Sequence, residues 1–318
     1  MRILQVLPMY HPVGEKYLQQ HAEVIKTDNY DPAHLKKLIK DVDGVLVRAP
    51  ARLTEEILES AEQVKAVSGA GVGLDNIDVE FASKKGIKVL HAPKVNTVAT
   101  AEHAVTLILS VAKKITYFHG EMKIGNFDSR NDHYTQEVYG KQLGLVGWGD
   151  IAQQVAHICS YGLNMKICAY VRSVNKEKVE AAAKYNVELT TDLNNLLETS
   201  DYVSVHLPHT KETEALINKE KLERMKKTSY LVNTGRGGVV DEKALYSALK
   251  ENKIAGAAVD VFRKEPPGDN HPFYSLNNIL MTPHVGGISE EAAKSSSELV
   301  AKNLVGAING KEVPNSAN

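Results

Sequence analysis

The sequence predicts an α/β protein in which helices cover both faces of parallel sheets. Strand-like and helix-like segments alternate along almost all of the 318 residues, the pattern of doubly wound sheets. The strand-like segments are short apolar runs, such as residues 44–47, that suit strands buried on both faces. Turns rich in glycine and polar residues follow several of them, where open α/β sheets place their ligands. The length suffices for two domains, each with its own core.

The first block of elements opens the chain directly, with residues 2–7 as its first strand. Asp31 before Pro32 is a helix-start pattern, Thr54 begins a capped helix, and Asp78 caps another helix after the glycine-rich loop 69–76. The predicted strands are 2–7, 44–47, 66–68 and 87–90, and the predicted helices are 15–25, 32–39, 54–61 and one that starts after Asp78.

A long apolar-periodic segment, residues 97–115, predicts one helix that joins two domains. Residues 123–139 are polar and irregular, which indicates a surface loop. A second βα series runs from Leu143 to Met281, and the helix 290–308 packs back on the first domain. We therefore expect one domain of residues 1–98 plus 290–318, a second domain of residues 99–289, and a loose tail at 314–318.

Composition excludes several classes of function. Hydrophobic residues make up 43% and charged residues 24%, and the formal net charge is −1, which argues against a broad nucleic-acid or anionic-membrane surface. No apolar run reaches the roughly 18 residues of a membrane span. Cys159 and Cys168 have neither metal-ligand nor redox spacing, so we expect no metal site and two small buried residues in a reducing cytoplasm.

The segment 142–152 predicts a dinucleotide-binding turn between a strand and a helix. Gly147 allows the tight turn, Gly149 lets the backbone approach a pyrophosphate, and Ala152 lets helix and strand pack closely. Amides at the helix start, around Asp150 and Ile151, would bind the phosphates. The Asp150 carboxylate would repel a pyrophosphate at short range, so either cofactor affinity is modest or this side chain points to solvent.

The next strand, 165–170, should end beside the adenosine ribose, where an NAD-preferring site usually has Asp or Glu. Here the position is Val171, followed by Arg172 and Ser173. Without a carboxylate nothing repels a 2′-phosphate, and Arg172 and Ser173 can bind one by charge and hydrogen bond. The sequence favours NADP(H), with NAD(H) as the alternative in which Arg172 lies along the adenine.

Three turns, 234–238, 261–267 and 282–287, each follow an apolar strand-like run and contain Arg236, Glu265 and His284. They offer a fixed cation, a carboxylate and an imidazole. That set suits reduction of a 2-oxo acid, whose carboxylate must be bound and whose carbonyl oxygen must be protonated.

With these residues the chain resembles the D-2-hydroxyacid dehydrogenase family along nearly its whole length. The motifs that carry the resemblance are 71–78, 86–93, Ala101-Glu102-His103, the nucleotide turn, His206-Leu207-Pro208, 233–238, 258–262, Glu265-Pro266 and Thr282-Pro283-His284. The resemblance implies a flavodoxin-like substrate domain, a Rossmann cofactor domain, an active site in the cleft between them, and a homodimer built around the cofactor domain and its long helix.

The resemblance also implies a role for each catalytic residue. Arg236 would bind the substrate carboxylate in a planar fork and polarise the carbonyl. His284 would be the proton donor in reduction and the acceptor in oxidation. Glu265 would raise the histidine's pKa and orient its ring. His206 is a second candidate for the acid, which we assign instead to structure or cofactor contact.

Further contacts follow from the same resemblance. Asp260 would bind the nicotinamide carboxamide, and the loop 206–213 would pass under the dinucleotide. The remaining expected cofactor contacts are Pro208, Thr213, Thr234, Gly235, Gly286 and Thr100. Amides of Gly71, Val72 and Gly73, with Arg48 nearby, would receive the substrate carboxylate, and Asn96 is a hinge candidate. A second interpretation of Gly71 and Gly73, compatible with the first, is a plain loop that needs positive φ.

The expected activity is reversible reduction of a short 2-oxo acid such as glyoxylate or hydroxypyruvate. 3-Phosphohydroxypyruvate is the alternative substrate, and its phosphate would need further cations, for which Arg48, Arg52 and Lys94 are available. Ser68 and Gly69, however, replace the basic pattern often found in phosphoglycerate dehydrogenases. Formate oxidation is disfavoured because that branch has an amide in place of Glu265. The alternative of another class is a dinucleotide-sensing binding protein of the corepressor type.

Overall fold

The computed structural model describes residues 1–318 and divides into two compact units. The first unit comprises Met1–Asn96 and Gly287–Asn318, and the second comprises Thr97–Gly286. These junctions lie within three residues of the expected domain boundaries. None of the helices combines the length and the apolar character that crossing a membrane would require.

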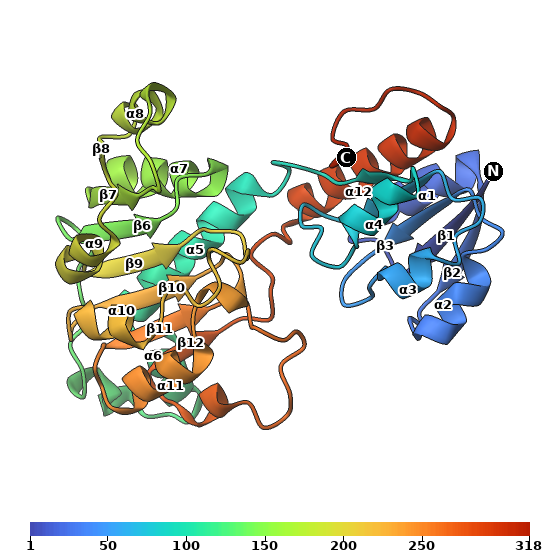
Figure 1. Cartoon of the computed structure of the whole chain (residues 1–318). Helices are drawn as coiled ribbons and strands as arrows, with labels where there is room; N and C mark the ends of the chain where they lie inside the picture. The colour runs from blue at the N-terminus through green and yellow to red at the C-terminus, as the bar shows by residue number, and fades with distance from the viewer. The chain divides into compact units, whose positions relative to one another are not determined.

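The first unit contains a five-stranded parallel sheet of order β2-β1-β3-β4-β5 (Figure 1). Its strands are β1 (Arg2–Val6), β2 (Glu23–Thr27), β3 (Gly44–Val47), β4 (Ala66–Gly69) and β5 (Lys88–Leu90). Every residue of β3 and β4 is buried, as their continuous apolar sequence predicts for strands covered on both faces. The helices are α1 (Pro12–His21), α2 (Pro32–Leu38), α3 (Glu55–Leu58), α4 (Val79–Lys84) and α12 (Glu290–Ile308).

Helix starts in this unit follow their capping residues. Asp31 accepts hydrogen bonds from the amides of Ala33 and His34, and Asp78 accepts one from the amide of Phe81. Thr54 makes no side-chain capping bond, and its helix α3 is a single turn rather than the expected eight residues.

The expected helix 15–25 is wrong in its second half. Helix α1 ends at His21, and Glu23–Thr27 forms the edge strand β2, which pairs with β1 along its full length. The run from Val24 to Thr27 contains β-branched residues, and a place at the sheet edge lets two of its five side chains stay exposed.

The last helix, α12, packs along α1, as the sequence predicted (Figure 1). The tail 314–318, expected to be loose, is bound to β5 instead. The amide of Ala317 donates to the carbonyl of Val89, and the Asn318 side chain accepts from the amide of Val89 and donates to the carbonyl of Ile87. The tail thus occupies hydrogen-bonding groups of an edge strand, which composition alone does not reveal.

The second unit contains a seven-stranded parallel sheet of order β12-β11-β10-β9-β6-β7-β8. Its strands are β6 (Gln142–Val146), β7 (Lys166–Tyr170), β8 (Val187–Thr190), β9 (Tyr202–Val205), β10 (Tyr230–Asn233), β11 (Gly256–Val259) and β12 (Ile279–Met281). Its α-helices are α5 (Thr97–Ala112), α6 (Ile115–Lys123), α7 (Asp150–His157), α8 (Lys176–Ala183), α9 (Leu193–Thr199), α10 (Lys219–Arg224) and α11 (Glu242–Lys250). Both sheets therefore have the expected parallel α/β architecture.

The single helix expected over 97–115 is interrupted. Lys114 adopts a left-handed conformation with φ 50°, which ends the run of α5 and redirects the chain into α6. The segment expected to be a loop, 123–139, begins at the last residue of α6 and contains a short 3₁₀ helix, Phe127–Asn131. Helix α5 accounts for residues 97–112 of the expected helix and has seven buried residues, whereas α6 shares only residue 115 with it and has none.

Candidate active site

Three neighbouring strands bring the predicted catalytic residues to one edge of the second unit's sheet. Asn233, Val259 and Met281 are register partners at the ends of β10, β11 and β12. Arg236 and His284 each follow three residues after these partners, and Glu265 follows in the turn after β11. Because the strands are parallel, the three turns emerge at the same edge.

Arg236 follows β10 in a turn held by the buried side chain of Asn233. The amide of Gly235 donates to Asn233 Oδ1 at 3.1 Å, and Asn233 Nδ2 donates to the carbonyl of Arg236 at 3.1 Å. The guanidinium itself is partly exposed and donates from Nη1 to the carbonyl of Gly235 at 2.9 Å. The turn therefore fixes the base of a side chain whose planar fork matches a carboxylate.

Glu265 and His284 form a direct pair. His284 Nδ1 lies 2.6 Å from Glu265 Oε2, and the amide of Phe262 donates to Glu265 Oε1 at 2.9 Å. The side chain of His284 is 46% exposed and that of Glu265 is 35% exposed, so a ligand can reach the pair. With Nδ1 engaged by the carboxylate, Nε2 is the ring nitrogen that can exchange a proton with a ligand.

The electrostatics of this pair favour the charged forms of both partners. The hydrogen bond with Glu265 raises the pKa of His284 above its usual range, although burial of the ring lowers it. The negative charges of Glu265 and Asp260 also raise this pKa, and the positive charge of Arg236 lowers it. Burial opposes ionisation of Glu265, but bonds from His284 and the Phe262 amide, with the charges of His284 and Arg236, leave its pKa lowered. The structure thus brings all three predicted catalytic residues within electrostatic reach of one another.

Asp260, at the end of β11, is only 2% exposed. Its Oδ1 accepts bonds from Thr282 Oγ1 at 2.6 Å and the amide of Val285 at 2.9 Å, and its Oδ2 accepts one from the amide of Gly286 at 2.8 Å. Burial disfavours its charge, yet bonds from His103, Thr282 and the two amides leave its pKa lowered. The carboxylate expected to bind a carboxamide is therefore committed largely to the segment that carries His284.

His206 does not compete as the proton donor. Its Nε2 lies 2.9 Å from Ser204 Oγ, and burial lowers its pKa to about 4. A histidine with that pKa is neutral near neutral pH and has no proton to give as an imidazolium.

The nucleotide turn has the conformation that its glycines require. Gly147 has φ 111°, and a Cβ there would lie 2.9 Å from the carbonyl oxygen of His206. A Cβ on Gly149 would meet nothing within 4 Å, and no side chain caps the start of α7. Asp150 is exposed at the first position of this helix, and Ile151 is partly buried. The amides at the helix start are thus left available to phosphates.

Three buried polar atoms, one of them in this turn, provide a test of whether a dinucleotide fits. Trp148 Nε1, Thr234 Oγ1 and Thr100 Oγ1 are buried without a hydrogen-bond partner in the protein. Such atoms are costly to leave unpaired unless a ligand satisfies them. Two of the three are predicted cofactor contacts, and the third belongs to the glycine turn itself, so the residues present fit a dinucleotide.

The rest of the predicted cofactor loop is internally bonded. Thr213 Oγ1 donates to the carbonyl of Pro208 at 2.6 Å. At the end of β7, Val171 is buried, whereas Arg172 and Ser173 are exposed. These two polar side chains lie where the sequence expects the adenosine ribose.

The predicted substrate contacts belong to the first unit. Gly71, Val72 and Gly73 follow β4, and neither glycine has a positive φ, so the alternative reading of these glycines as left-handed turn residues is wrong. Arg48 follows β3; its guanidinium stacks on the Tyr10 ring at 5.2 Å, and its Nε is buried without a partner. Asn96 Nδ2 lies 2.7 Å from the position that a Cβ on Gly287 would occupy.

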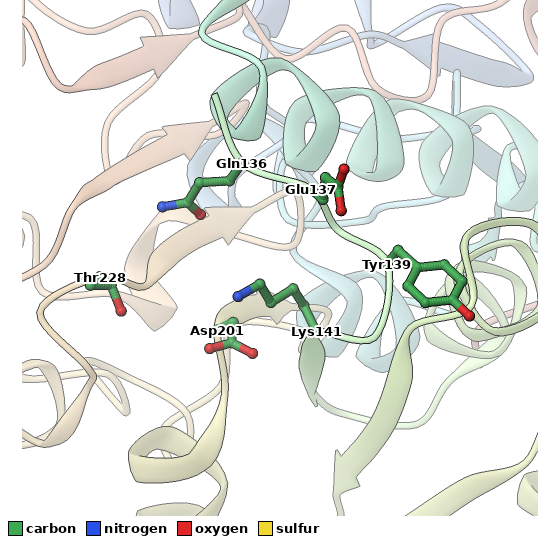
Figure 2. Close-up of a pocket in the computed structure, with 6 residues that line it drawn as sticks. All are labelled: Gln136, Glu137, Tyr139, Lys141, Asp201 and Thr228. Atoms are coloured by element: carbon green, nitrogen blue, oxygen red, sulfur yellow. The ribbon is translucent and has the colours of Figure 1, made fainter. Parts of the chain in front are cut away.

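A separate hollow of about 520 Å³ lies at the other edge of the second unit's sheet (Figure 2). Its wall contains residues that come just before strands: Lys141 before β6, Asp201 before β9 and Thr228 before β10. It is therefore at the amino ends of these strands and contains none of the predicted site residues.

The comparison with known families decides the identity of the fold. Residues 105–286 match the model of the D-isomer specific 2-hydroxyacid dehydrogenase, NAD binding domain. The chain belongs to this family. Residues Gly147, Arg236, Glu265 and His284 all lie within the matched segment.

Relatives in this dehydrogenase family carry two different names. The chain is 39% identical over its full length to the D-3-phosphoglycerate dehydrogenase of Methanocaldococcus jannaschii, of which it covers 59%. It is 40% identical to the glyoxylate reductase of Thermococcus kodakarensis over 96% of the chain and 92% of that protein. The chain thus spans little more than half the length of the phosphoglycerate dehydrogenases it matches.

Solved structures agree with the fold. The TT0316 protein of Thermus thermophilus superimposes with a TM-score of 0.91 at 30% identity, over the whole of both chains. The NADPH-dependent glyoxylate/hydroxypyruvate reductase of Sinorhizobium meliloti, determined with NADP and malonate, gives 0.88 at 26% identity over 99% of this chain and 96% of that chain.

Two residues that organise this candidate site have no role predicted from the sequence. Asn233, read only as part of a motif, bridges the Arg236 turn. His103 belongs to the motif Ala101-Glu102-His103, which carries the family resemblance but no predicted function, and in the structure its Nε2 lies 3.4 Å from Asp260 Oδ1. Helical periodicity places His103 on α5, but only the fold shows what it contacts.

Proposed function

We propose that the chain is an NAD(P)H-dependent D-2-hydroxyacid dehydrogenase that interconverts a small 2-oxo acid and its 2-hydroxy acid. The observation that carries the proposal is the 2.6 Å pair of His284 and Glu265 in the same unit as Arg236. An acid of raised pKa beside a fixed guanidinium is the set that carbonyl reduction requires.

In the proposed mechanism Arg236 binds the substrate carboxylate through its fork and leaves a donor to polarise the carbonyl. The imidazolium of His284 then donates a proton from Nε2 to the carbonyl oxygen, and in the reverse direction Nε2 accepts it. Glu265 stabilises the imidazolium and fixes the ring through Nδ1. The nicotinamide supplies or accepts the hydride when it is bound.

The residues that would bind this cofactor are those of the glycine turn and its surroundings. Gly147 and Gly149 with the first amides of α7, among them that of Ile151, would bind the pyrophosphate. The unpartnered hydroxyls of Thr234 and Thr100 would bind nearer the nicotinamide. Gly235, Gly286 and the remaining lone pairs of Asp260 complete the set.

For the substrate, we propose a short 2-oxo acid of the glyoxylate or hydroxypyruvate type. Gly71–Gly73 and Arg48 would receive the carboxylate from the first unit. A phosphorylated substrate is less well supported, because Ser68 is a buried serine whose hydroxyl donates to the Gly69 carbonyl, and Gly69 has no side chain. Arg52 is exposed and donates to the carbonyl of Asp75. Some relatives are named D-3-phosphoglycerate dehydrogenase and others glyoxylate reductase. Phosphoglycerate dehydrogenase activity is therefore the second candidate.

For the cofactor, we propose NADP(H), with NAD(H) as the alternative. Val171 supplies no carboxylate to repel a 2′-phosphate, and exposed Arg172 and Ser173 follow it. The Sinorhizobium meliloti neighbour was determined with NADP, which supports this choice.

We further propose that the enzyme is a cytoplasmic homodimer. The segment 115–134 exposes several large apolar side chains, and a second copy would cover them: Ile115, Met122, Ile124, Phe127 and Tyr134. Cys159 and Cys168 are buried, and burial raises their pKa values to about 12 and about 11, so both are inert thiols suited to a reducing compartment. Sedimentation of the purified chain tests the oligomeric state.

Loss of NADPH or NADH absorbance with glyoxylate, hydroxypyruvate, pyruvate and 3-phosphohydroxypyruvate tests the activity. We expect the highest kcat/KM with NADPH and a short unphosphorylated acid. A clear preference for 3-phosphohydroxypyruvate would establish the second candidate. Tight dinucleotide binding without turnover of any of these acids would refute the dehydrogenase and favour a sensing protein of the corepressor type.

A further inference from the structure

The segment that carries His284 has an unusual backbone. His284 adopts φ 54°, a left-handed conformation that is uncommon for a residue with a side chain. Such a conformation persists only where surrounding contacts determine it. Here three successive amides, 284 to 286, all donate to Asp260: to its carbonyl at 2.8 Å, to Oδ1 at 2.9 Å and to Oδ2 at 2.8 Å.

Asp260 is in turn contacted by His103 from α5. His103 Nε2 lies 3.4 Å from Asp260 Oδ1 and 3.1 Å from Thr282 Oγ1. The Thr282 hydroxyl donates its proton to Asp260 Oδ1 at 2.6 Å, so its oxygen accepts from His103 and Nε2 carries a hydrogen. The three side chains form a closed set of donors and acceptors.

The packing around this set leaves little room for rearrangement. Gly286 is buried between the partners, and a Cβ there would lie 2.9 Å from Asp260 Oδ2 and 3.1 Å from His103 Cδ2. Asp260 is almost fully buried, and the side chain of His103 is 18% exposed. The imidazole therefore contacts the same carboxylate oxygen, Oδ1, that the Thr282 hydroxyl and the Val285 amide bind.

We propose that His103 is a positioning residue for proton transfer. By binding Asp260 and Thr282 together, it fixes the carboxylate that shapes the 284–286 backbone, and through that backbone it fixes the direction of the His284 ring. The proposal rests on the proposed function, in which His284 is the proton donor. The proposal gives α5 a role in positioning the backbone of the proton donor, a role predicted for none of the site residues.

The placement of the ring has a direct kinetic consequence. A proton donor must come within hydrogen-bond reach of the atom it protonates, and small displacements lower the rate of that step. Glu265 alone fixes the ring at Nδ1, but the backbone at 284 decides where the whole ring lies. Loss of His103 should therefore slow proton transfer while leaving substrate binding by Arg236 nearly intact.

Two substitutions of His103 test the proposal. His103→Leu removes both contacts at similar volume, whereas the terminal amide of His103→Gln can still donate to Thr282 and Asp260. We expect His103→Leu to lower kcat at least tenfold when the rate is divided by the concentration of enzyme with bound cofactor. KM should change less than threefold, and the D₂O isotope effect on kcat should be larger than in the wild type. His103→Gln should restore kcat to within about threefold of the wild type.

A second measurement does not depend on turnover. In the protein without cofactor, hydrogen exchange of a peptide spanning residues 282–288 should be at least tenfold faster in His103→Leu than in the wild type. His34→Leu is the matched control, because His34 Nε2 makes a contact of the same 3.1 Å length with Thr27 Oγ1 in the first unit. This control should leave both kcat and exchange at 282–288 unchanged.

If the wild type reduces no 2-oxo acid, the proposed function fails. If the wild type is active, the positioning role is overturned by either of two results: a kcat of His103→Leu within twofold of the wild type, or a kcat of His103→Gln as low as that of His103→Leu. Should His103→Leu not fold, Thr282→Val against Thr282→Ser repeats the test, since only serine retains the bridging hydroxyl. Equal kcat in those two variants would likewise overturn the role.

Discussion

The buried carboxylate of Asp260 offers a stability prediction whose size follows from its contacts. Asp260→Asn keeps one acceptor oxygen for Thr282 and Val285 but places an amide nitrogen opposite the amide of Gly286, now bonded at 2.8 Å. A hydrogen bond to a charged group contributes about 1.5–3 kcal/mol, and a buried donor left unpaired adds about 1–3 kcal/mol. Removing the desolvation cost of the charge offsets part of this loss. We expect the free energy of unfolding to fall by about 2–4 kcal/mol.

Thermal unfolding measures this change, because 1 kcal/mol shifts Tm by about 2–4 °C in a domain of the second unit's size. The expected fall is therefore roughly 4–16 °C. Asp31→Asn is the control: Asp31 also accepts two amide bonds, but at an exposed helix start where asparagine caps equally well. A fall of less than 1 °C in Asp260→Asn, or an equal fall in both variants, would refute the reasoning.

The same substitution should change how stability depends on pH. The pKa of Asp260 is lowered in the folded protein, so its contribution is fully present above the unfolded value of about 3.9 and is lost as pH falls toward the folded pKa. The difference in Tm between the wild type and Asp260→Asn should thus be constant near neutral pH and shrink in acid. If the difference in Tm between the two proteins stayed the same down to pH 3, loss of the carboxylate charge would not be the cause of the destabilisation.

Three substitutions test the proposed chemistry. Arg236→Ala should lower kcat/KM by roughly 10²–10³-fold, about 3–4 kcal/mol, as for a lost transition-state donor, with KM raised as well; an unchanged kcat/KM refutes its role. Glu265→Gln removes the charge that raises the pKa of His284, so the fall of the reduction rate with rising pH should move to lower pH while cofactor affinity stays constant. An unmoved profile would count against the pair. Val171→Asp introduces a carboxylate where the adenosine ribose is expected and should shift preference toward NADH, and an unaltered NADPH/NADH ratio of kcat/KM would locate specificity elsewhere.

Much of the fold was predictable because the central strands are buried on both faces. The segment 44–47 is a fully buried strand with the expected bounds, and the helix 290–308 begins and ends as its pattern indicates. The edge strand β2 and the bound tail were not predictable. Both depend on pairing with a partner distant in sequence, which no local pattern reports. The break at Lys114 depends on one left-handed residue inside an otherwise periodic run.

The candidate site shows the same division between local and distant information. Arg236, Glu265 and His284 each stand in a turn after an apolar run, so their chemistry and their common edge could be inferred. His103 lies on α5, whose sequence does not indicate which residue it contacts, and its partner Asp260 is 157 residues away in the chain. The family resemblance implied that Asp260 binds a ligand, whereas in the structure its carboxylate oxygens accept bonds from the amides of Val285 and Gly286, which follow His284.

The topology explains why such an anchor is needed. The three proposed catalytic residues rest on the adjacent strands β10, β11 and β12, and the ladder of hydrogen bonds continues past the strand ends: the amide of Asp260 donates to Asn233, and that of Thr282 to Val259. The bases of the turns are thus as rigid as the sheet. Glu265 lies six residues beyond Val259, however, and its partner follows β12, an edge strand of three residues with no fully buried side chain. Because no side chain of this edge strand is fully buried, we infer that the buried Asp260 is the main anchor of the His284 turn. Disturbing that carboxylate should therefore affect the proton donor before it affects Arg236.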